Sequence, residues 1–412
     1  MKVLIVGSGG REHAIGWKIK QDNPSVELFF SVGNAGTAKI GENIGISDLE
    51  ELKDFAKNNK IDFTIVGPEM ELVDGIVDIF EAEGLKIFGP NQKAAELEGS
   101  KVFAKDFMEK HGVKTAFAKS FRHFVDARDY LNTIEEFPVV IKASGLAAGK
   151  GVVIVQNNDE GQEVIRDMMN DKAFGDAGTQ VVIEQFLEGF ECSILSIYNG
   201  KEIVPFISAK DHKKIGEGET GLNTGGMGVV APNPLFTDAH FEAFKKDILE
   251  PTQKGLVAEG FDFAGVIFFG LMVNESGVYL LEYNVRFGDP ETEAVLPLMN
   301  SDLLEIIEKA VNGESFEVSW KNQHTCCVVL ASGGYPLNYD KGFEIKGLDR
   351  VDVPLFIAGA QKTEDAIVTS GGRVLNVVGI GDNLEQARKS AYENIAKINF
   401  DYAYFREDIG KV

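Results

Sequence analysis

The chain is poor in cysteine: it has three, of which Cys326 and Cys327 are adjacent. Three cysteines cannot form a disulfide framework, and no Cys-x-x-Cys or other zinc-type spacing occurs in the sequence. This composition predicts a protein of a reducing, cytoplasmic compartment in which cysteine serves as a small apolar residue.

Long apolar runs are also missing. The run at 3–6 is followed by glycines, Arg11 and Glu12, which is typical of a buried strand and unlike a signal peptide. The stretch 264–273 is broken by Gly265 and Gly270 and is far too short to span a membrane. We therefore expect no membrane partner.

Positive charge is in deficit, because 41 lysines and arginines face 64 acidic residues and leave a net charge of −23. A phosphate backbone would repel such a chain outside a local basic patch, so no nucleic-acid partner is expected. A hydrophobic share of 44% and a charged share of 25% are typical of a folded protein, and 412 residues exceed one ordinary domain. We expect several domains and a monomer.

The first hundred residues alternate short apolar runs with amphipathic stretches such as 48–58 and 73–82. The runs lie at 3–6, 28–32, 64–66 and 86–88. This alternation predicts a parallel sheet with helices on both faces, whose ligands collect at the carboxyl edge of the strands. The segments expected at that edge, of which the first two are rich in glycine, are 7–11, 33–36 and 67–69. Glycine lets backbone N–H groups approach an anion.

A dinucleotide site is the alternative for this edge, and the sequence disfavours it. Glu12 stands where the Gly-x-Gly-x-x-Gly fingerprint needs its last glycine. The second strand ends at Val32 and Gly33, without the acid that would hold a ribose hydroxyl. A phosphate of another ligand is the better interpretation.

The middle of the chain predicts a phosphate-binding flap. Strands at 139–142 and 152–155 flank a glycine-rich loop that contains Lys150, and Lys142 ends the first strand. The loop is no Walker motif, because Gly151 stands where a Ser or Thr would bind magnesium. A helix at 100–111 also carries Lys101 and Lys105 on one face, which by itself is equally typical of a solvated basic stripe.

Two later strands favour a nucleotide and a metal ion. The strand beginning at 181 runs into an irregular segment that could offer backbone groups to adenine and the Glu191 carboxylate to ribose, although an ordinary strand end would look similar. In the strand at 279–286, Glu282, Asn284 and Arg286 are predicted to share one face. Hard oxygen ligands suit Mg²⁺, and arginine can hold a phosphoryl group or a carboxylate. An exposed polar face fits poorly, because the preceding residues are strongly apolar.

Taken in order, these segments resemble the ATP-grasp superfamily, and within it the phosphoribosylamine–glycine ligase (glycinamide ribonucleotide synthetase) family. The resemblance covers essentially the whole chain and rests on the segments 7–13, 141–151, 211–214, 223–228, 284–292 and 371–374. It implies a multidomain α/β and α+β fold. The implied parts are an N-terminal parallel α/β domain (1–100), a two-part ATP-grasp domain (101–120 and 187–324), its flap subdomain (121–186) and a small C-terminal α+β domain (325–412).

The resemblance also implies ATP and Mg²⁺ (or Mn²⁺) as cofactors and assigns residues to them. The implied metal ligands are Glu282 and Asn284, and the implied ATP-binding residues are Lys105, Lys142, Gly149, Lys150, Glu184, Gln185, Leu187 and Glu191. Catalytic roles fall to Asp211, Lys213 and Arg286. Substrate contacts fall to Gly9, Gly10, Arg11, Asn34, Gly67, Glu69, Asn223, Gly225, Gly226, Gly372 and Arg373.

The implied reaction joins glycine to 5-phosphoribosylamine through glycyl phosphate, a step of purine synthesis. Another ATP-grasp carboxylate–amine ligase or carboxylase of purine metabolism is the nearest alternative, and a non-catalytic nucleotide-binding regulator is a third. Ser144 and Leu222 depart from the Asp and Pro that relatives often have there, and we expect these departures to tune activity without abolishing it.

Overall fold

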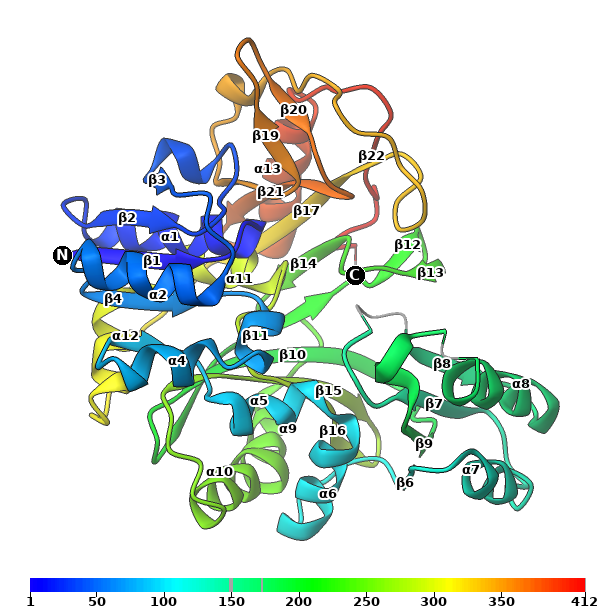
Figure 1. Ribbon diagram of the computed structural model, residues 1–412. Coiled ribbons are helices and arrows are strands. Elements are labelled where there is room, and N and C mark those ends of the chain that lie inside the picture. The colour runs from blue at the N-terminus through cyan, green and yellow to red at the C-terminus, as the bar shows by residue number, and fades with distance from the viewer. Residues whose placement is uncertain (148–150, 172, 412) are drawn as a thin grey trace.

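The computed structural model describes residues 1–147, 151–171 and 173–411 (Figure 1). The N-terminal part is a five-stranded sheet in the order β3-β2-β1-β4-β5, and every pair in it is parallel, as predicted. Its strands are β1 (Lys2–Val6), β2 (Glu27–Phe30), β3 (Glu42–Asn43), β4 (Phe63–Val66) and β5 (Ile87–Phe88). Its α-helices are α1 (Gly10–Asp22), α2 (Leu49–Asn58), α3 (Glu69–Val73), α4 (Ile76–Ala82) and α5 (Gln92–Gly99).

The register of this sheet brings the glycine-rich strand ends together. Val6 pairs with Val66, and the Gly33 N–H donates to the Gly7 carbonyl at 3.1 Å. Helix α4 lies within the predicted amphipathic stretch 73–82, and Gly75, which takes a left-handed conformation with φ of 86°, separates it from α3.

The flap forms a separate antiparallel sheet in the order β6-β9-β7-β8, and its β7–β8 hairpin is confirmed. Its strands are β6 (Ala118–Phe121), β7 (Val139–Ala143), β8 (Val152–Val155) and β9 (Val181–Gln185). Helices α7 (Phe124–Leu131) and α8 (Asn158–Met169) pack against them around a hydrophobic cluster of their own. Helix α6 (Lys101–His111) precedes this sheet and is capped by the Ser100 hydroxyl, which accepts from the Phe103 N–H.

The rest of the chain is built on one nine-stranded sheet in the order β16-β15-β10-β11-β14-β17-β21-β18, with β22 paired to β17. The pairing of β14 with β17 joins the central part of the chain (residues 187–324) to the C-terminal part (residues 325–412). The strands of the C-terminal part therefore continue the central sheet. The strands are β10 (Phe190–Tyr198), β11 (Ile203–Asp211), β14 (Gly228–Ala231), β15 (Gly265–Asn274), β16 (Gly277–Asn284), β17 (His324–Ser332), β18 (Leu355–Ile357), β21 (Arg373–Gly381) and β22 (Ala403–Tyr404). Two small hairpins, β12 (Lys214–Gly216) with β13 (Thr220–Asn223) and β19 (Ala360–Lys362) with β20 (Ile367–Thr369), stand apart from it.

Helices pack around the large sheet, and one of them, α11, lies between the sheet and helix α1 (Figure 1). They are α9 (Asp238–Phe244), α10 (Glu250–Ala258), α11 (Glu291–Val295), α12 (Leu303–Val311) and α13 (Leu384–Ile395). In the part of the chain that the structure describes, no helix has both the length and the apolar character needed to cross a bilayer.

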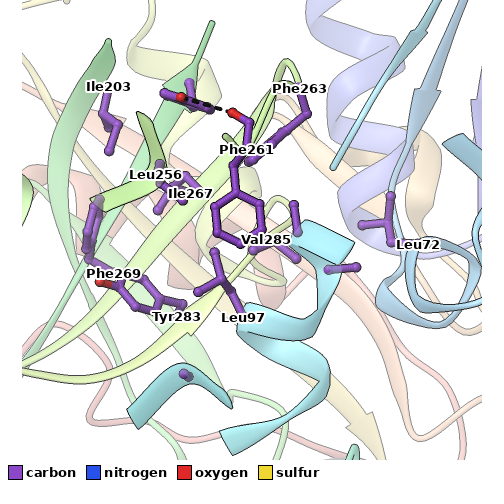
Figure 2. Close-up of a cluster of buried hydrophobic side chains, with 14 of the residues drawn as sticks. Leu72, Leu97, Ile203, Leu256, Phe261, Phe263, Ile267, Phe269, Tyr283 and Val285 are labelled. Carbon is purple, nitrogen blue, oxygen red and sulfur yellow. Dashed lines mark hydrogen bonds between the residues drawn. The ribbon is translucent and has the colours of Figure 1, made fainter. Parts of the chain in front are cut away.

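The N-terminal and central parts share one hydrophobic core, shown in Figure 2. Leu72 from α3 and Leu97 from α5 belong to the same buried cluster as Ile267 and Phe269 of β15 and Tyr283 of β16. Burial of such side chains stabilises a fold by about 1.5–3 kcal/mol each. Groups at the junction of these two parts are therefore carried on rigidly packed elements.

Candidate active site

Two buried lysines converge on one glutamate where the flap meets helix α6. Lys142 Nζ lies 2.9 Å from Glu184 Oε2, and Lys105 Nζ lies 3.2 Å from Glu184 Oε1. Lys105 also donates to the Thr115 hydroxyl at 2.7 Å. The solvated-stripe interpretation is wrong for Lys105, because its side chain is buried. Burial lowers the pKa of Lys105 to about 8; Glu184 opposes this effect and Lys142 adds to it.

The neighbouring predicted nucleotide residues lie at the end of β9. The Glu184 side chain points inward to the lysines, Gln185 is exposed and Leu187 is half-buried. The Gln185 N–H already donates to the Phe117 carbonyl at 2.9 Å. Gly149 and Lys150 lie outside the described residues.

Glu282 and Asn284 lie at the end of β16, facing the same lysines. A register shift opposite Gly270 and Leu271 leaves Leu281 out of the ladder, and its carbonyl accepts from Lys142 Nζ at 3.3 Å. Burial would raise the pKa of Glu282, but Lys213, Lys142 and Lys101 outweigh it and lower the pKa. The carboxylate is therefore held ionised in a cationic pocket.

These two side chains suit a divalent cation that shares its ligands with phosphate. A charged carboxylate and an amide oxygen are hard donors of the kind that Mg²⁺ takes. No cluster of three or more His, Cys, Asp or Glu residues that could hold a metal ion occurs within residues 1–147, 151–171 and 173–411. Such an ion would thus complete its coordination with oxygens of water and of a bound nucleotide.

Arg286 lies beyond the strand, since β16 ends at Asn284, so the predicted three-residue strand face is wrong in its last member. Its guanidinium is near two carboxylates of the N-terminal part: Nη2 lies 3.1 Å from Glu98 Oε1, and Nε lies 3.3 Å from Glu69 Oε2. Its charge still acts on Glu282 and contributes to the lowered pKa there. Arg286 therefore faces both Glu282 and the carboxylates of the N-terminal part.

Asp211 ends β11, and Lys213 follows it two residues later. Lys213 Nζ lies 2.6 Å from Glu191 Oε2, so the Glu191 carboxylate is already paired. Asp211 is half-buried, but its Oδ1 is buried and has no hydrogen-bond partner in the part of the chain that the structure describes. Burial, and then the charge of Glu291, raise the pKa of Asp211 well above its usual range. Glu291 accepts from the Ser193 hydroxyl at 3.2 Å.

The carboxyl edge of the N-terminal sheet meets Asp289. The Gly9 N–H donates to Glu12 Oε2 at 2.5 Å, and a Cβ on Gly9 would lie 3.1 Å from Asp289 Oδ2. Arg11 donates through Nη1 to the Phe287 carbonyl at 3.1 Å. From the other side, Arg373 Nη2 lies 2.8 Å from Asp289 Oδ1. The first turn of α1 and the C-terminal part thus converge on one loop.

The loop 223–228 is held against this site by the C-terminal part. The Gly225 N–H donates to the Tyr335 hydroxyl at 2.9 Å, and Arg373 Nη1 donates to the Gly225 carbonyl at 2.5 Å. Gly226 has φ of 115°, and a Cβ there would lie 2.8 Å from Asp211 Oδ1. Asn223 is exposed, and a side chain on Gly372 would collide with the Tyr335 ring.

Asn34 and Gly67 were predicted to contact substrate, and contacts within the protein itself explain why these residue types stand at both positions. The buried Asn34 amide donates to the Ser8 carbonyl at 2.8 Å and to the Ile357 carbonyl at 2.7 Å, while its oxygen accepts from the Gly36 N–H at 2.7 Å. A Cβ on Gly67 would collide with the Glu12 carboxylate. Asn34 therefore joins the N-terminal and C-terminal parts.

The sequence interpretation missed three acidic residues of this region: Glu98, Asp289 and Glu291. The last two lie inside the segment 284–292 that carried the resemblance, and that signal could have indicated them. Glu98 lies in a helix and far along the sequence from Arg286, so no local pattern indicates it.

Three models of one family match the chain. Phosphoribosylglycinamide synthetase N domain matches residues 1–98, its ATP-grasp (A) domain matches 99–292 and its C domain matches 325–412. The chain belongs to the phosphoribosylglycinamide synthetase family. The family resemblance seen in the sequence is confirmed, and so is its three-part architecture.

Individual members of the phosphoribosylglycinamide synthetase family are similar over their full length. The phosphoribosylamine–glycine ligase of Fusobacterium nucleatum subsp. nucleatum is 56% identical, covering 100% of this chain and 98% of the relative. That of Clostridium acetobutylicum is 50% identical and covers 100% of both. The crystal structure of the Thermotoga maritima phosphoribosylamine–glycine ligase has a TM-score of 0.89 at 34% identity, covering 99% of this chain and 100% of that one. This membership makes the chain a carbon–nitrogen ligase that uses ATP with a divalent metal ion and acts on small molecules.

The buried Lys105 gives an expected pH dependence. Because burial lowers its pKa to about 8, the free protein loses this charge above about pH 8, whereas bound phosphate would favour the charged form. We expect kcat/KM for ATP to be level below pH 8 and to fall by up to about tenfold per unit above it. Calorimetry at pH 8.5 in buffers of different ionisation enthalpy should show proton uptake on ATP binding, and the uptake should vanish in Lys105→Met. A level profile to pH 9.5 would contradict this role of Lys105.

Proposed function

We propose that this chain joins glycine to 5-phosphoribosylamine, converting ATP to ADP and phosphate and forming glycinamide ribonucleotide for purine synthesis. The observation that carries this proposal is that two regions suited to anions lie on either side of Arg286. A cationic pocket with Glu282 lies on one side of Arg286, and the glycine-rich first turn of α1 lies on the other. Full-length relatives with the corresponding names support the choice of substrates.

In this proposal the nucleotide lies between the flap and β16. Lys105 and Lys142 exchange part of their pairing with Glu184 for the phosphates of ATP, and the end of β9, with Gln185 and Leu187, lies along the adenine. Glu282 and Asn284 hold Mg²⁺ (or Mn²⁺) when it is bound, and the ion neutralises phosphate charge. The flap 121–186 closes over the nucleotide through its glycine-rich loop, which contains Gly149 and Lys150, and excludes water.

The first chemical step transfers the γ-phosphoryl group to glycine. A glycine carboxylate oxygen forms a bond to the γ-phosphorus while the bond from that phosphorus to the β,γ-bridging oxygen breaks, which yields glycyl phosphate and ADP. In this proposal Lys213 and Arg286, whose charges both act on Glu282, stabilise the charge that moves in this step. Asp211, with Glu291 nearby, accepts hydrogen bonds from the glycine ammonium; its Oδ1, which has no hydrogen-bond partner among the described residues, supports this role.

In the second step the amine of phosphoribosylamine attacks the glycyl carbonyl carbon. A carbon–nitrogen bond forms, the carbon–oxygen bond to phosphate breaks, and the departing phosphate takes up the proton that the amine loses. We propose that the 5-phosphate binds the first turn of α1 at Gly9, Gly10 and Arg11, since helix N-termini favour phosphate. Glu69, Gly225, Arg373 and the nearby Asn223 and Gly372 then face the rest of this substrate.

The test is phosphate release from Mg-ATP with glycine, with phosphoribosylamine and with both. We expect substantial release only when both are present, together with formation of the amide product. Full activity with bicarbonate or formate in place of glycine would instead support another ATP-grasp ligase or carboxylase. We further propose a cytoplasmic monomer, in keeping with three buried free cysteines in the described part of the chain.

A further inference from the structure

Glu98 binds two consecutive residues, Val285 and Arg286, in the segment that follows β16. Its carboxylate is 8% exposed and lies in the last turn of α5. Oε1 lies 3.1 Å from Arg286 Nη2, and Oε2 accepts from the Val285 N–H at 2.7 Å. Both carboxylate oxygens are thus used, one on the backbone and one on the side chain of adjacent residues.

The surroundings of Glu98 are otherwise unfavourable to a carboxylate. Burial disfavours its charged form, and the charges of Glu69 and Glu282 act in the same direction. The C-terminal turn of a helix also disfavours negative charge. Arg286 is the cation that opposes these effects. Because a buried carboxylate is costly unless paired, the pairing with Arg286 explains why it is tolerated there.

The second carboxylate beside Arg286 is held differently. Glu69 is paired with Nε at 3.3 Å, and its side chain is 33% exposed. Nε itself is buried and makes no hydrogen bond to any of the described residues. A guanidinium fixed at Nη2 by Glu98 therefore keeps its charge between Glu69 and Glu282.

We propose that Glu98 is the positioning residue of Arg286, fixing its guanidinium at Nη2 so that its positive charge faces the transferring phosphoryl group or the glycine carboxylate. Both carboxylates beside Arg286 come from the N-terminal part, whereas Arg286 follows a strand of the large sheet. Glu98 thereby makes the pose of Arg286 depend on the docking of these two parts. The inference rests on the proposed function, because it assigns Arg286 to that reaction.

The first test is Glu98→Gln, which keeps the size of the side chain. A carboxylate accepts at both oxygens, whereas an amide accepts at only one, so either Val285 or Arg286 loses its partner. Because misplacement by about 1 Å can cost about 100-fold in rate, we expect kcat to fall by roughly 10- to 100-fold while KM for ATP changes less than about twofold. Glu96→Gln is the matched control, since Glu96 is exposed on the same helix. Equal kcat values for Glu98→Gln and Glu96→Gln would overturn the proposal.

A double-variant comparison separates positioning from general damage. If Glu98 acts through Arg286, the variant that combines Glu98→Gln with Arg286→Lys should be no slower than Arg286→Lys alone. Losses that multiply would show that Glu98 supports the fold independently of Arg286 and would overturn the proposal. Thermal unfolding of each variant reports damage to the fold directly.

A substrate-free measurement distinguishes this inference from the proposed function. The ¹⁵Nε–H resonance of Arg286, assigned through its loss in Arg286→Lys, should shift in Glu98→Gln and stay unchanged in Glu96→Gln. A shift in a protein that is inactive with glycine and phosphoribosylamine would support positioning and reject the proposed function. An unshifted resonance in an active enzyme would reject positioning and leave the proposed function standing.

Discussion

Replacing Glu282 with glutamine should lower kcat by about three orders of magnitude and leave the fold intact. Glutamine fills the same volume but removes the negative charge that Lys213, Lys142 and Lys101 surround. The pocket then holds cations without their counter-charge, and a divalent ion loses its one anionic ligand from this pair of side chains. The remaining Asn284 amide is a weaker ligand for Mg²⁺ than a carboxylate.

The measurement is phosphate release with glycine and phosphoribosylamine both saturating, over a range of Mg²⁺ concentrations. We expect the half-saturating Mg²⁺ concentration to rise along with the fall in kcat. Glu275→Gln is the matched control, because Glu275 is exposed in the turn between β15 and β16, on the same hairpin. Near-normal turnover of Glu282→Gln would remove Glu282 from the metal site.

The sequence predicted those strands and hairpins whose structure follows from a local pattern of apolar and polar residues. The apolar runs of β1 and β4 are buried on both faces, which is how a parallel strand covered by helices appears in sequence. The β7–β8 hairpin and the pair Glu282 and Asn284 follow from strand alternation over a few residues. The end of β16 was misjudged because its pairing with β15 stops at Phe268 and Asn284, although β15 itself continues to Gly265 beside β10.

The features that escaped prediction depend on contacts between distant parts of the chain. Pairing of β14 with β17 joins residues about a hundred positions apart, and no local pattern encodes it. Glu184 illustrates the same limit: its place in a strand was evident, but its two lysine partners come from α6 and β7. Glu98 belongs to this region only because α5 packs beside the segment that follows β16.

Replacing Asp211 with asparagine should lower kcat/KM for glycine by about 10²- to 10³-fold and leave KM for ATP nearly unchanged. Asp211 lies beside Glu291, and its buried Oδ1 finds no hydrogen-bond donor within the described ranges. A glycine ammonium would supply the missing donor and add positive charge to that of Lys213 and Arg373. Removing one partner of a buried charge pair typically costs about 2–5 kcal/mol, which sets the size of the expected loss.

The pH dependence of kcat/KM for glycine is the most specific test of the role of Asp211. Burial and the charge of Glu291 raise the pKa of Asp211, and this side chain must be ionised before it can pair with an ammonium ion. In the wild type, kcat/KM for glycine should therefore rise with pH until Asp211 is ionised in the free protein, whereas in Asp211→Asn this rise should be lost. Asp340→Asn, which alters an exposed aspartate, should keep both the rate and the pH profile of the wild type. An Asp211→Asn enzyme that retained the wild-type rise with pH would transfer the ammonium-binding role from Asp211 to Glu291, because Glu291 is the other acid beside it whose pKa is raised.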